Sequence, residues 1–403
     1  MKQKLKGYKG ITLIALIITI IVLLILAVVA ISAVKGDGII AHAKNAKKEY
    51  SEAQINETTT ISGYESYIED NKPGAVKKVE KNLDKVLSTK DNTPLIDKCG
   101  NKITVPAGFK IITKTDTENT DLNYTADTID VTKGIVVEDE EGNQFVWIPV
   151  GTIYTDIEKT EANAKTITLG RYSNFTKTNN AYTVAQNASD YGTQVKINNS
   201  HTEDTTATHN PDYKNSIAKN IGEFCTKTLA SGGYYLGRYE ARAGTTERKP
   251  KTDTLTPVTL KANDYVYNYV TQAQASERCQ SMYTNKPYES DLVNSYAWDT
   301  AIIFFQEFGD NSTYASKKSV NSSLANTGTS GTSYTGTKDV ICNVYDMASN
   351  CWEWSTETST YSGAPCTVCG GYYFSSLYYT STRSFNSMTY ASGGYSFRPL
   401  LYM

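Results

Sequence analysis

The feature that most constrains the fold of this chain is residues 11–34, a run of 24 residues without a charge. As an α-helix rising 1.5 Å per residue, this run would span about 36 Å, more than the roughly 30 Å hydrocarbon core of a bilayer. The ten residues before it carry four lysines. Because positive flanks stay on the cytoplasmic side, the sequence predicts a single-pass protein of the cell membrane, with everything after residue 34 extracytoplasmic.

The junction of the basic segment and the apolar run, KG followed by ITLIAL, resembles a type IV prepilin signal. The resemblance implies that residues 1–10 are a basic leader, that a prepilin peptidase cuts after Gly10, and that Ile11 becomes the methylated amino terminus. Residues 11–34 would then be a transmembrane helix. In residues 35–72, apolar or small residues recur three and four apart, which resembles the amphipathic spine helix of a pilin.

Ala15 departs from the pilin pattern, since most pilins carry a Glu at this fifth mature position. A carboxylate inside a membrane needs a partner, and in pilins that partner is the amino terminus of the neighbouring subunit. Docking beside other pilin-like subunits loses this charge pair here. A minor subunit or a non-polymerising anchor therefore fits the sequence better than a major subunit, and an uncleaved signal anchor is the alternative.

The rest of the chain can form a large core, because 403 residues with 39% apolar content leave room for more than one domain. Residues 73–102, rich in Lys, Asp and Asn, are expected to be a linker before a domain over residues 103–403. A net charge of −2 gives no electrostatic case for nucleic acid as a partner. The three histidines are too scattered for a His-based metal centre, and no metal site is predicted.

The domain has the pattern of an α+β fold. Short β-prone runs lie on both sides of an acidic turn at residues 139–142. The capping-box pair Thr271 and Gln274 predicts a helix over about 271–282, and an apolar stripe predicts a second helix from about residue 290 to a stop at Gly309. Residues 151–220, rich in Thr and Asn, are expected to be an insertion of long surface loops.

The carboxyl-terminal segment, residues 370–403 and here called the tail, holds seven Tyr, seven Ser and four Gly but only two charges. Tyr offers a large, rigid contact area at low entropic cost, and Ser and Gly supply adaptable hydrogen bonding, as in antibody paratopes. We interpret the tail as a variable binding surface. A terminal β-hairpin with half-buried Tyr rings is the alternative, because aromatic residues favour strands.

Two motifs relate the domain to a known family. The stretch NVYDMASNCWEW supplies Asn343, Asn350, Trp352, Glu353 and Trp354, and the tail frame supplies Gly370, Gly371, Arg383, Phe397, Arg398 and Pro399. Together they resemble the formylglycine-generating-enzyme (sulfatase-modifying-factor) family, and also the C-type-lectin-fold variable proteins of diversity-generating retroelements. The resemblance implies a C-type-lectin-like fold with short strands, two helices and long loops.

The same resemblance assigns roles to residues. The scaffold would comprise Asn343, Asn350, Trp352, Glu353, Trp354, Arg383, Phe397 and Arg398. The ligand-binding residues would be Tyr372, Tyr373, Ser375, Ser376, Tyr378, Tyr379, Ser381, Asn386, Tyr390 and Tyr395. No cofactor is predicted, although calcium at Asn350 and Glu353 stays open because family members with calcium bind it in this loop. A Glu between two Trp can equally bond backbone amides and hold the loop.

Cysteines decide between an enzyme and a binding protein. In the enzyme family a copper-binding cysteine pair lies between the GG and the Arg of the tail, but the matching residues 372–382 contain no Cys. Cys366 and Cys369 lie before this segment and are expected to be a disulfide or two buried thiols rather than half a metal site. No catalytic residue is therefore predicted.

The sequence accordingly predicts a pilin-like cell-surface adhesin or receptor, not an enzyme. Its expected partners are the membrane, the prepilin peptidase, other pilin-like subunits and an extracellular protein or glycan. An extracytoplasmic formylglycine-generating-type oxidase and a structural minor pilin subunit are the alternatives.

Overall fold

The computed structural model describes a defined part of the chain: residues 18–24, 26, 85–116, 121–178, 180–184, 201–203, 221–245, 248, 255–262, 264–318, 339–359, 363–373, 375 and 377–403. The chain divides into two compact units, Met1–Lys77 and Lys78–Met403.

In the first unit, residues 18–24 and 26 are α-helical and exposed. Gly10, Ile11, the remainder of the 11–34 run and the predicted spine helix over 35–72 lie outside the described residues. Among the residues that are described, no helix combines the length and the apolar character needed to cross a membrane.

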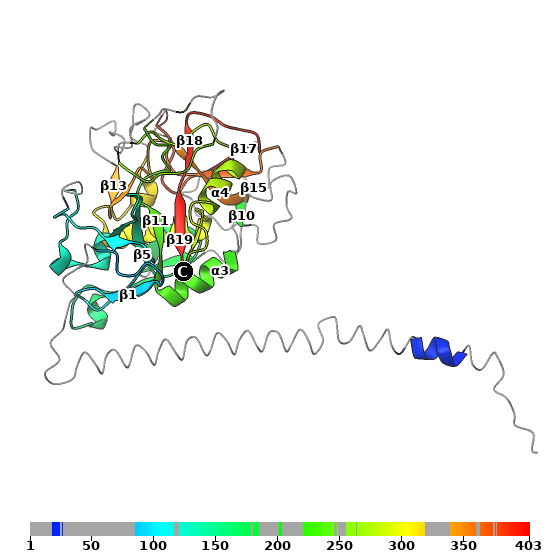
Figure 1. Ribbon diagram of the computed structural model, residues 1–403, viewed down its shortest axis with the longest axis horizontal. Helices are drawn as coiled ribbons and strands as arrows, with labels where there is room; N and C mark the ends of the chain where they lie inside the picture. The colour runs from blue at the N-terminus through cyan, green and yellow to red at the C-terminus, as the bar shows by residue number, and fades with distance from the viewer. Residues whose placement is uncertain are drawn as a thin grey trace, which may run out of the picture. The chain divides into compact units, whose positions relative to one another are not determined.

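The second unit is built on a six-stranded antiparallel sheet (Figure 1). In spatial order its strands are β12 (Glu289–Leu292), β19 (Pro399–Tyr402), β11 (Gly233–Gly237), β5 (Gln144–Pro149), β4 (Val136–Glu138) and β3 (Lys110–Ile111). Every residue of β5 and β11 is buried, and apart from Gln144 the sequences QFVWIP and GYYLG are continuously apolar, aromatic or small. Strand β19 lies inside the sheet, between β12 and β11.

A second sheet carries the tail. Its strands are β10 (His201–Glu203), β15 (Trp352–Ser359), β16 (Cys366–Cys369) and β17 (Arg383–Asn386), and β18 (Tyr395–Phe397) pairs parallel with β15. Strand β15 is therefore a shared neighbour of β16 and β18. Since β17, β18 and β19 follow one another in the tail, the tail joins the two sheets.

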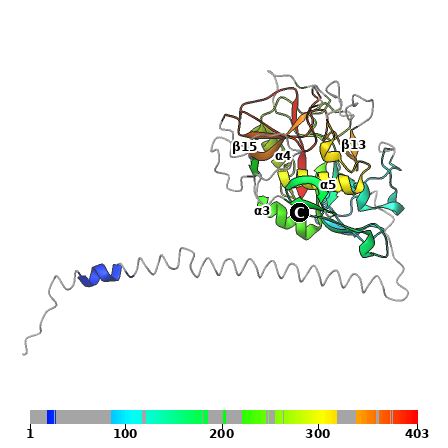
Figure 2. The same cartoon turned by 180° about the vertical axis from the view of Figure 1, so that it is seen from behind.

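Three α-helices cover the sheets: α3 (Ile221–Ser231), α4 (Gln272–Gln280) and α5 (Ser295–Phe308). Helix α5 contacts β5 of the first sheet and β15 of the second, and Figure 2 shows it from behind. The four described 3-10 turns are η1 (Ala126–Thr128), η2 (Val131–Lys133), η3 (Glu161–Asn163) and η5 (Tyr314–Ser316).

The helix predictions are confirmed in part. Thr271 caps α4, and Gln274 completes the predicted capping box. Gly309 follows the end of α5, as predicted, but the helix begins at Ser295 and not near residue 290, because residues 289–292 are held in β12 by pairing with β19. Helix α3 was not predicted.

The predicted linker over residues 73–102 is wrong in its described part. Strand β1 (Thr93–Ile96) pairs with β2 (Lys102–Val105), and the turn between them is folded around the buried Asp97. The Asp97 carboxylate accepts hydrogen bonds from the backbone of Cys99, Asn101 and Val131. The folded domain therefore begins before residue 103.

The predicted loop-rich insertion over residues 151–220 also needs correction. It contains two hairpins: β6 (Gly151–Tyr154) with β7 (Ala164–Ile167), and β8 (Tyr172–Thr178) with β9 (Ala181–Val184). Ile153, Ile167, Tyr172 and Phe175 are buried in the main core.

A further hairpin, β13 (Val340–Ile341) with β14 (Val344–Tyr345), precedes strand β15, which begins with the WEW sequence. The described domain is of mixed α+β class, as predicted.

Candidate functional site

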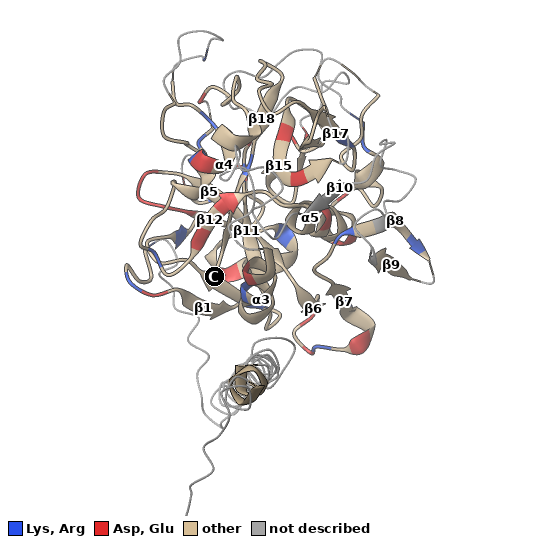
Figure 3. Cartoon of the chain, turned by 90° about the vertical axis from the view of Figure 1, so that its right-hand side faces the viewer, with Lys and Arg blue, Asp and Glu red and all other residues tan. Residues whose placement is uncertain are grey.

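The tail contributes three strands and two connecting loops. Residues 370–382 join β16 to β17, and residues 387–394 join β17 to β18. Strands β17 and β18 lie at the end of the domain opposite to α3, at the top in Figures 1 and 3. Both loops are therefore presented at this end.

Five tyrosines of these loops and the first residue of β18 form what we call the aromatic face: Tyr372, Tyr373, Tyr378, Tyr379, Tyr390 and Tyr395. Five of them are half-buried, and Tyr390 is 37% exposed. The face thus presents ring edges and hydroxyls to solvent, while part of each half-buried ring packs against the domain.

One half of the aromatic face rests on Trp352 of β15, which is buried. The ring of Tyr372 stacks on Trp352 with centroids 6.2 Å apart, and the ring of Tyr378 meets Trp352 edge-on at 4.6 Å. Tyr373 in turn packs edge-on against Tyr372 at 4.9 Å. Each ring is thereby fixed by the one beneath it.

The other half rests on Trp354, two residues further along β15. Tyr395 packs on Trp354 at 5.3 Å, and Tyr390 packs on Tyr395 at 4.9 Å. The side-chain amide of Asn386 donates to the Tyr395 hydroxyl at 2.8 Å. The spacing of Trp352 and Trp354 follows from the two-residue period of a strand, which directs both rings to the same side of the sheet.

The phenol groups of Tyr372 and Tyr395 are neutral over the physiological pH range. Burial, followed by the nearby Tyr373, raises the pKa of Tyr372 to about 12. Burial, followed by Tyr390, also raises the pKa of Tyr395. These two hydroxyls therefore act as uncharged donors and acceptors.

The two arginines of the tail point into the domain. Arg398 donates from Nε to Glu353 Oε2 at 2.9 Å, and it also donates to the carbonyls of Gly237 and Tyr345. Both side chains are buried. This pair connects the residue after β18 to the beginning of β15, so it fixes the strand that carries Tyr395.

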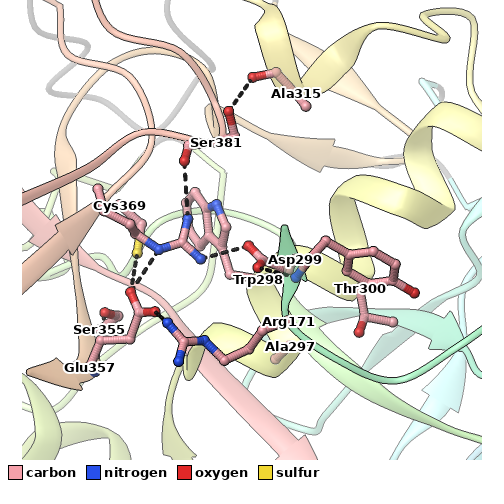
Figure 4. A network of polar contacts seen from close by, with 12 residues as sticks. Arg171, Ala297, Trp298, Asp299, Thr300, Ala315, Ser355, Glu357, Cys369 and Ser381 are labelled. Atoms are coloured by element: carbon pink, nitrogen blue, oxygen red, sulfur yellow. Dashed lines mark hydrogen bonds and ion pairs between the residues drawn. The ribbon is translucent and has the colours of Figure 1, made fainter. Parts of the chain in front are cut away.

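Arg383 is the centre of a second buried network (Figure 4). It donates from Nε to Glu357 Oε2 at 2.7 Å and from Nη2 to Asp299 Oδ1 at 2.6 Å. Arg171 donates to the other oxygen of Glu357 at 3.1 Å. The network connects β17 of the tail to β15, to α5 and to the residue that precedes β8.

The structure places the predicted scaffold residues in the interior. All eight are buried: Asn343, Asn350, Trp352, Glu353, Trp354, Arg383, Phe397 and Arg398. The side-chain amide of Asn343 donates to the carbonyls of Lys133 and Gly134. Glu353 bonds the Arg398 guanidinium rather than the backbone amides that the sequence suggested. Since both of its carboxylate oxygens accept from Arg398, they are not free for calcium.

Two of the predicted ligand-binding positions need comment. Ser381 is fully buried and donates to the carbonyl of Ala315 at 2.8 Å, so its assignment to the binding surface is wrong. Ser381 follows a turn that packs against residues 315–318. The backbone is buried there, and the side chain of Ser381 is buried with it. Ser376 lies outside the described residues, whereas Ser375 is half-buried next to Tyr372.

The two cysteines of the CTVC stretch lie on opposite faces of β16, because they are an odd number of residues apart. Cys366 belongs to the cluster beneath the aromatic face, and Cys369 belongs to the main core. Both are free thiols, and burial raises the pKa of Cys366 to about 12. Of the two expectations, buried thiols hold and a disulfide does not. Among the described residues no cluster of His, Cys, Asp and Glu could hold a metal ion.

One charged residue beside the aromatic face was missed by the sequence reasoning. Lys318 is exposed and its ammonium group lies 5.6 Å from the ring centre of Tyr379. The backbone of Lys318 forms a bridge with that of Tyr379, and the carbonyl of Lys317 accepts from Thr380. Nothing in the sequence signals this contact, because it joins residues about sixty positions apart.

No family model, no curated protein and no solved structure matches this chain. The function is therefore inferred from the chemistry of the site.

Proposed function

We propose that this protein is a pilin-like adhesin or receptor, anchored in the cell membrane by residues 11–34. Its extracytoplasmic domain, a C-type-lectin-type fold, binds a protein or glycan through the aromatic face. The observation that carries the proposal is the arrangement of the face: the half-buried rings of Tyr372, Tyr378 and Tyr395 pack directly on the buried Trp352 and Trp354.

Rigid aromatic rings favour binding for a physical reason. Association costs conformational entropy for each side chain that becomes ordered, and a ring already held by its neighbours has less to lose. Tyr373 and Tyr390 are each held by one further tyrosine, which itself rests on a tryptophan. Rings that are preorganised and still accessible have the properties of interface hot spots.

The chemistry of the tail supports a binding protein over an oxidase. A copper-dependent oxidase of the resembling family needs two thiols close together, and those of Cys366 and Cys369 face different clusters of the domain. A thiol whose pKa is raised by burial is also a poor metal ligand, because the thiolate is the species that binds.

The same arrangement suits diversification by a retroelement. Arg383 and Arg398 hold the tail in place from inside, so the tyrosines above them are free to change without loss of the ion pairs. A reverse transcriptase gene and a near-identical template repeat beside the coding sequence would be the genetic signature of this process.

The test is a binding measurement with the full-length chain in nanodiscs, applied to a panel of bacterial cells, phage particles and immobilised glycans. We expect saturable binding to at least one member of the panel. It should be lost when Tyr373, Tyr379 and Tyr390 are all replaced by Ser, and retained in Tyr154→Ala. Tyr154 is a half-buried tyrosine of β6, outside the tail, and serves as the matched control. Equal binding by the triple variant would contradict the proposal.

Pretreatment of the bound target identifies the ligand class. Loss of binding after protease treatment indicates a protein ligand, and loss after periodate oxidation indicates a glycan. Recovery of the chain as the main protein of sheared filaments would instead favour the structural pilin subunit.

A further inference from the structure

A ring from outside the tail lies against the tail loop that joins Tyr390 to Tyr395 of the aromatic face. In the segment Val266–Val270, four residues are buried, and Tyr269 alone is half-exposed. Its backbone has φ = 55°, in the left-handed region that a bulky aromatic residue rarely adopts. This conformation turns Tyr269 out of the core that its neighbours Tyr267 and Val270 occupy.

Tyr269 contacts the tail at the Gly393–Gly394 dipeptide. Its backbone N–H donates to the carbonyl of Ser392 at 3.1 Å. Its hydroxyl oxygen lies 2.7 Å from the point where a Cβ on Gly393 would stand, and a Cβ on Gly394 would lie 2.4 Å from the ring of Tyr372. One tyrosine ring therefore lies against each of the two glycines, and a side chain at either position would require the facing ring to shift.

The neighbouring residue reinforces this contact. Asn268 is buried, and its side-chain amide donates to the carbonyl of Gly393 at 2.9 Å. The backbone carbonyl of Asn268 accepts from Arg248 Nε at 2.8 Å. The tail loop and the segment that carries Tyr269 are thus held in a fixed position relative to each other.

We propose that Tyr269 is a ligand-binding residue of the aromatic face and its constant element, since it lies outside the variable tail. This inference rests on the proposed function. Strained backbone in a folded protein is kept where the surrounding structure enforces it, and such residues are concentrated at ligand-binding sites. The strain here places a phenol ring against Gly393, one residue from the glycine that Tyr372 contacts, where it adds an apolar surface and a hydroxyl to the proposed binding surface. The moiety that it takes is an uncharged, flat apolar group of the ligand.

The test uses Tyr269→Gly in the full-length chain. Glycine adopts a positive φ without steric cost, so the substitution relieves the backbone strain at this position and offsets the packing lost with the ring. We expect the melting temperature to stay within about 3 °C of the wild type or to rise. Binding to the panel member that the wild-type chain binds most tightly should weaken at least about tenfold, which corresponds to about 1.4 kcal/mol. Tyr269→Phe, which keeps the ring, should bind more tightly than Tyr269→Gly.

A second variant approaches the same ring from the tail. In Gly393→Ala the added Cβ would displace the Tyr269 hydroxyl, so binding should weaken in the wild-type background. In the Tyr269→Gly background the same change should have little further effect, because the ring to be displaced is gone. Fully additive losses would overturn the inference, as would unchanged binding by Tyr269→Gly.

The outcome is separable from that of the proposed function. If Tyr269→Gly binds as the wild type does while the triple tail variant does not, the aromatic face binds the ligand and Tyr269 is only structural. If neither change affects binding, the proposed function itself fails.

Discussion

Arg398 donates to both carboxylate oxygens of Glu353, from Nε at 2.9 Å and from Nη2, with both side chains buried. The pair connects the last segment of the tail to the strand that carries Trp352 and Trp354. The position of the tail therefore depends on a contact inside the domain core.

Removing one partner of this pair should destabilise the domain severely. Arg398→Met leaves a buried carboxylate without its counter-charge, and we expect a loss of about 3–5 kcal/mol in the free energy of unfolding. The double variant Arg398→Met with Glu353→Leu should recover much of this loss, because it removes the unpaired charge as well. Denaturant unfolding measures both, and a loss below about 1 kcal/mol in the single variant would contradict the account.

A second buried carboxylate predicts a specific pH dependence. Burial, then the neighbouring Glu353 and Asp346, raise the pKa of Glu240 well above its usual value. The folded state therefore holds a proton at pH values where the unfolded state has released it, and stability falls as pH rises above the unfolded pKa of about 4.3. This contribution is fully present only below that value.

Glu240→Gln isolates the effect, because Gln does not titrate. The free energy of unfolding of the wild type minus that of the variant should decrease steadily from pH 5 to pH 8. The variant is also destabilised by an amount that does not change with pH. Its side-chain NH₂ group replaces one of the two oxygens that accept from Asn350 and Cys351, so one of these donors faces another donor. Parallel stability curves for the two proteins over this pH range would show that Glu240 is ionised in the folded state.

The raised pKa values of the cysteine thiols predict a slow reaction with thiol reagents. Since burial raises the pKa of Cys342 and of Cys366 to about 12 and also raises that of Cys369, a thiol reagent at pH 8 should react with these three cysteines much more slowly in the native chain than in the denatured chain. The protein should not convert a Cys-containing sulfatase peptide or retain stoichiometric copper. Peptide turnover that disappears in Cys366→Ser or Cys369→Ser would favour the oxidase.

Helix α4 and the stop at Gly309 were predictable from sequence because capping boxes and terminal glycines act within a few residues. The burial of the scaffold motif was predictable because Trp and Phe have large apolar areas. The position of Ser381 was not, since its burial depends on Ala315, 66 residues away. Strand β1 was missed for the same reason. The polar composition of residues 73–102 resembles that of a linker, and the hydrogen bond that Asp97 accepts from Val131 forms only when distant parts of the chain fold together.

The tyrosines illustrate the same limit within one segment. Because alternate residues of a strand point to opposite faces, some tyrosines of the tail must point inward, but which ones do so depends on Trp352 and Trp354. Tyr372, Tyr378 and Tyr395 pack against the buried cluster below them, whereas Tyr390 remains the most exposed of the six. Composition shows that the tail is rich in tyrosine, and the packing partners determine which rings stay exposed.

The amino terminus carries a prediction of its own. If Gly10 ends the leader, the mature chain should begin with N-methylated Ile11, and intact-mass analysis of membrane-extracted protein will detect both changes. A chain that stays uncut in cells with an active prepilin peptidase would leave an ordinary signal anchor in place of the pilin-like one.

The most direct test of the account is a thermal melt and a binding measurement on the same two variants, Tyr390→Ala and Trp352→Ala. Trp352 is buried beneath two rings, and its truncation should cost about 3–5 kcal/mol of stability. Tyr390 is partly exposed, and its truncation should change stability by about 0.5 kcal/mol or less while binding to the panel target weakens by roughly 2 kcal/mol. If Tyr390→Ala instead lowers the melting temperature as much as Trp352→Ala does and leaves binding by the folded fraction unchanged, the tyrosines of the tail are core residues and the binding-surface account is wrong.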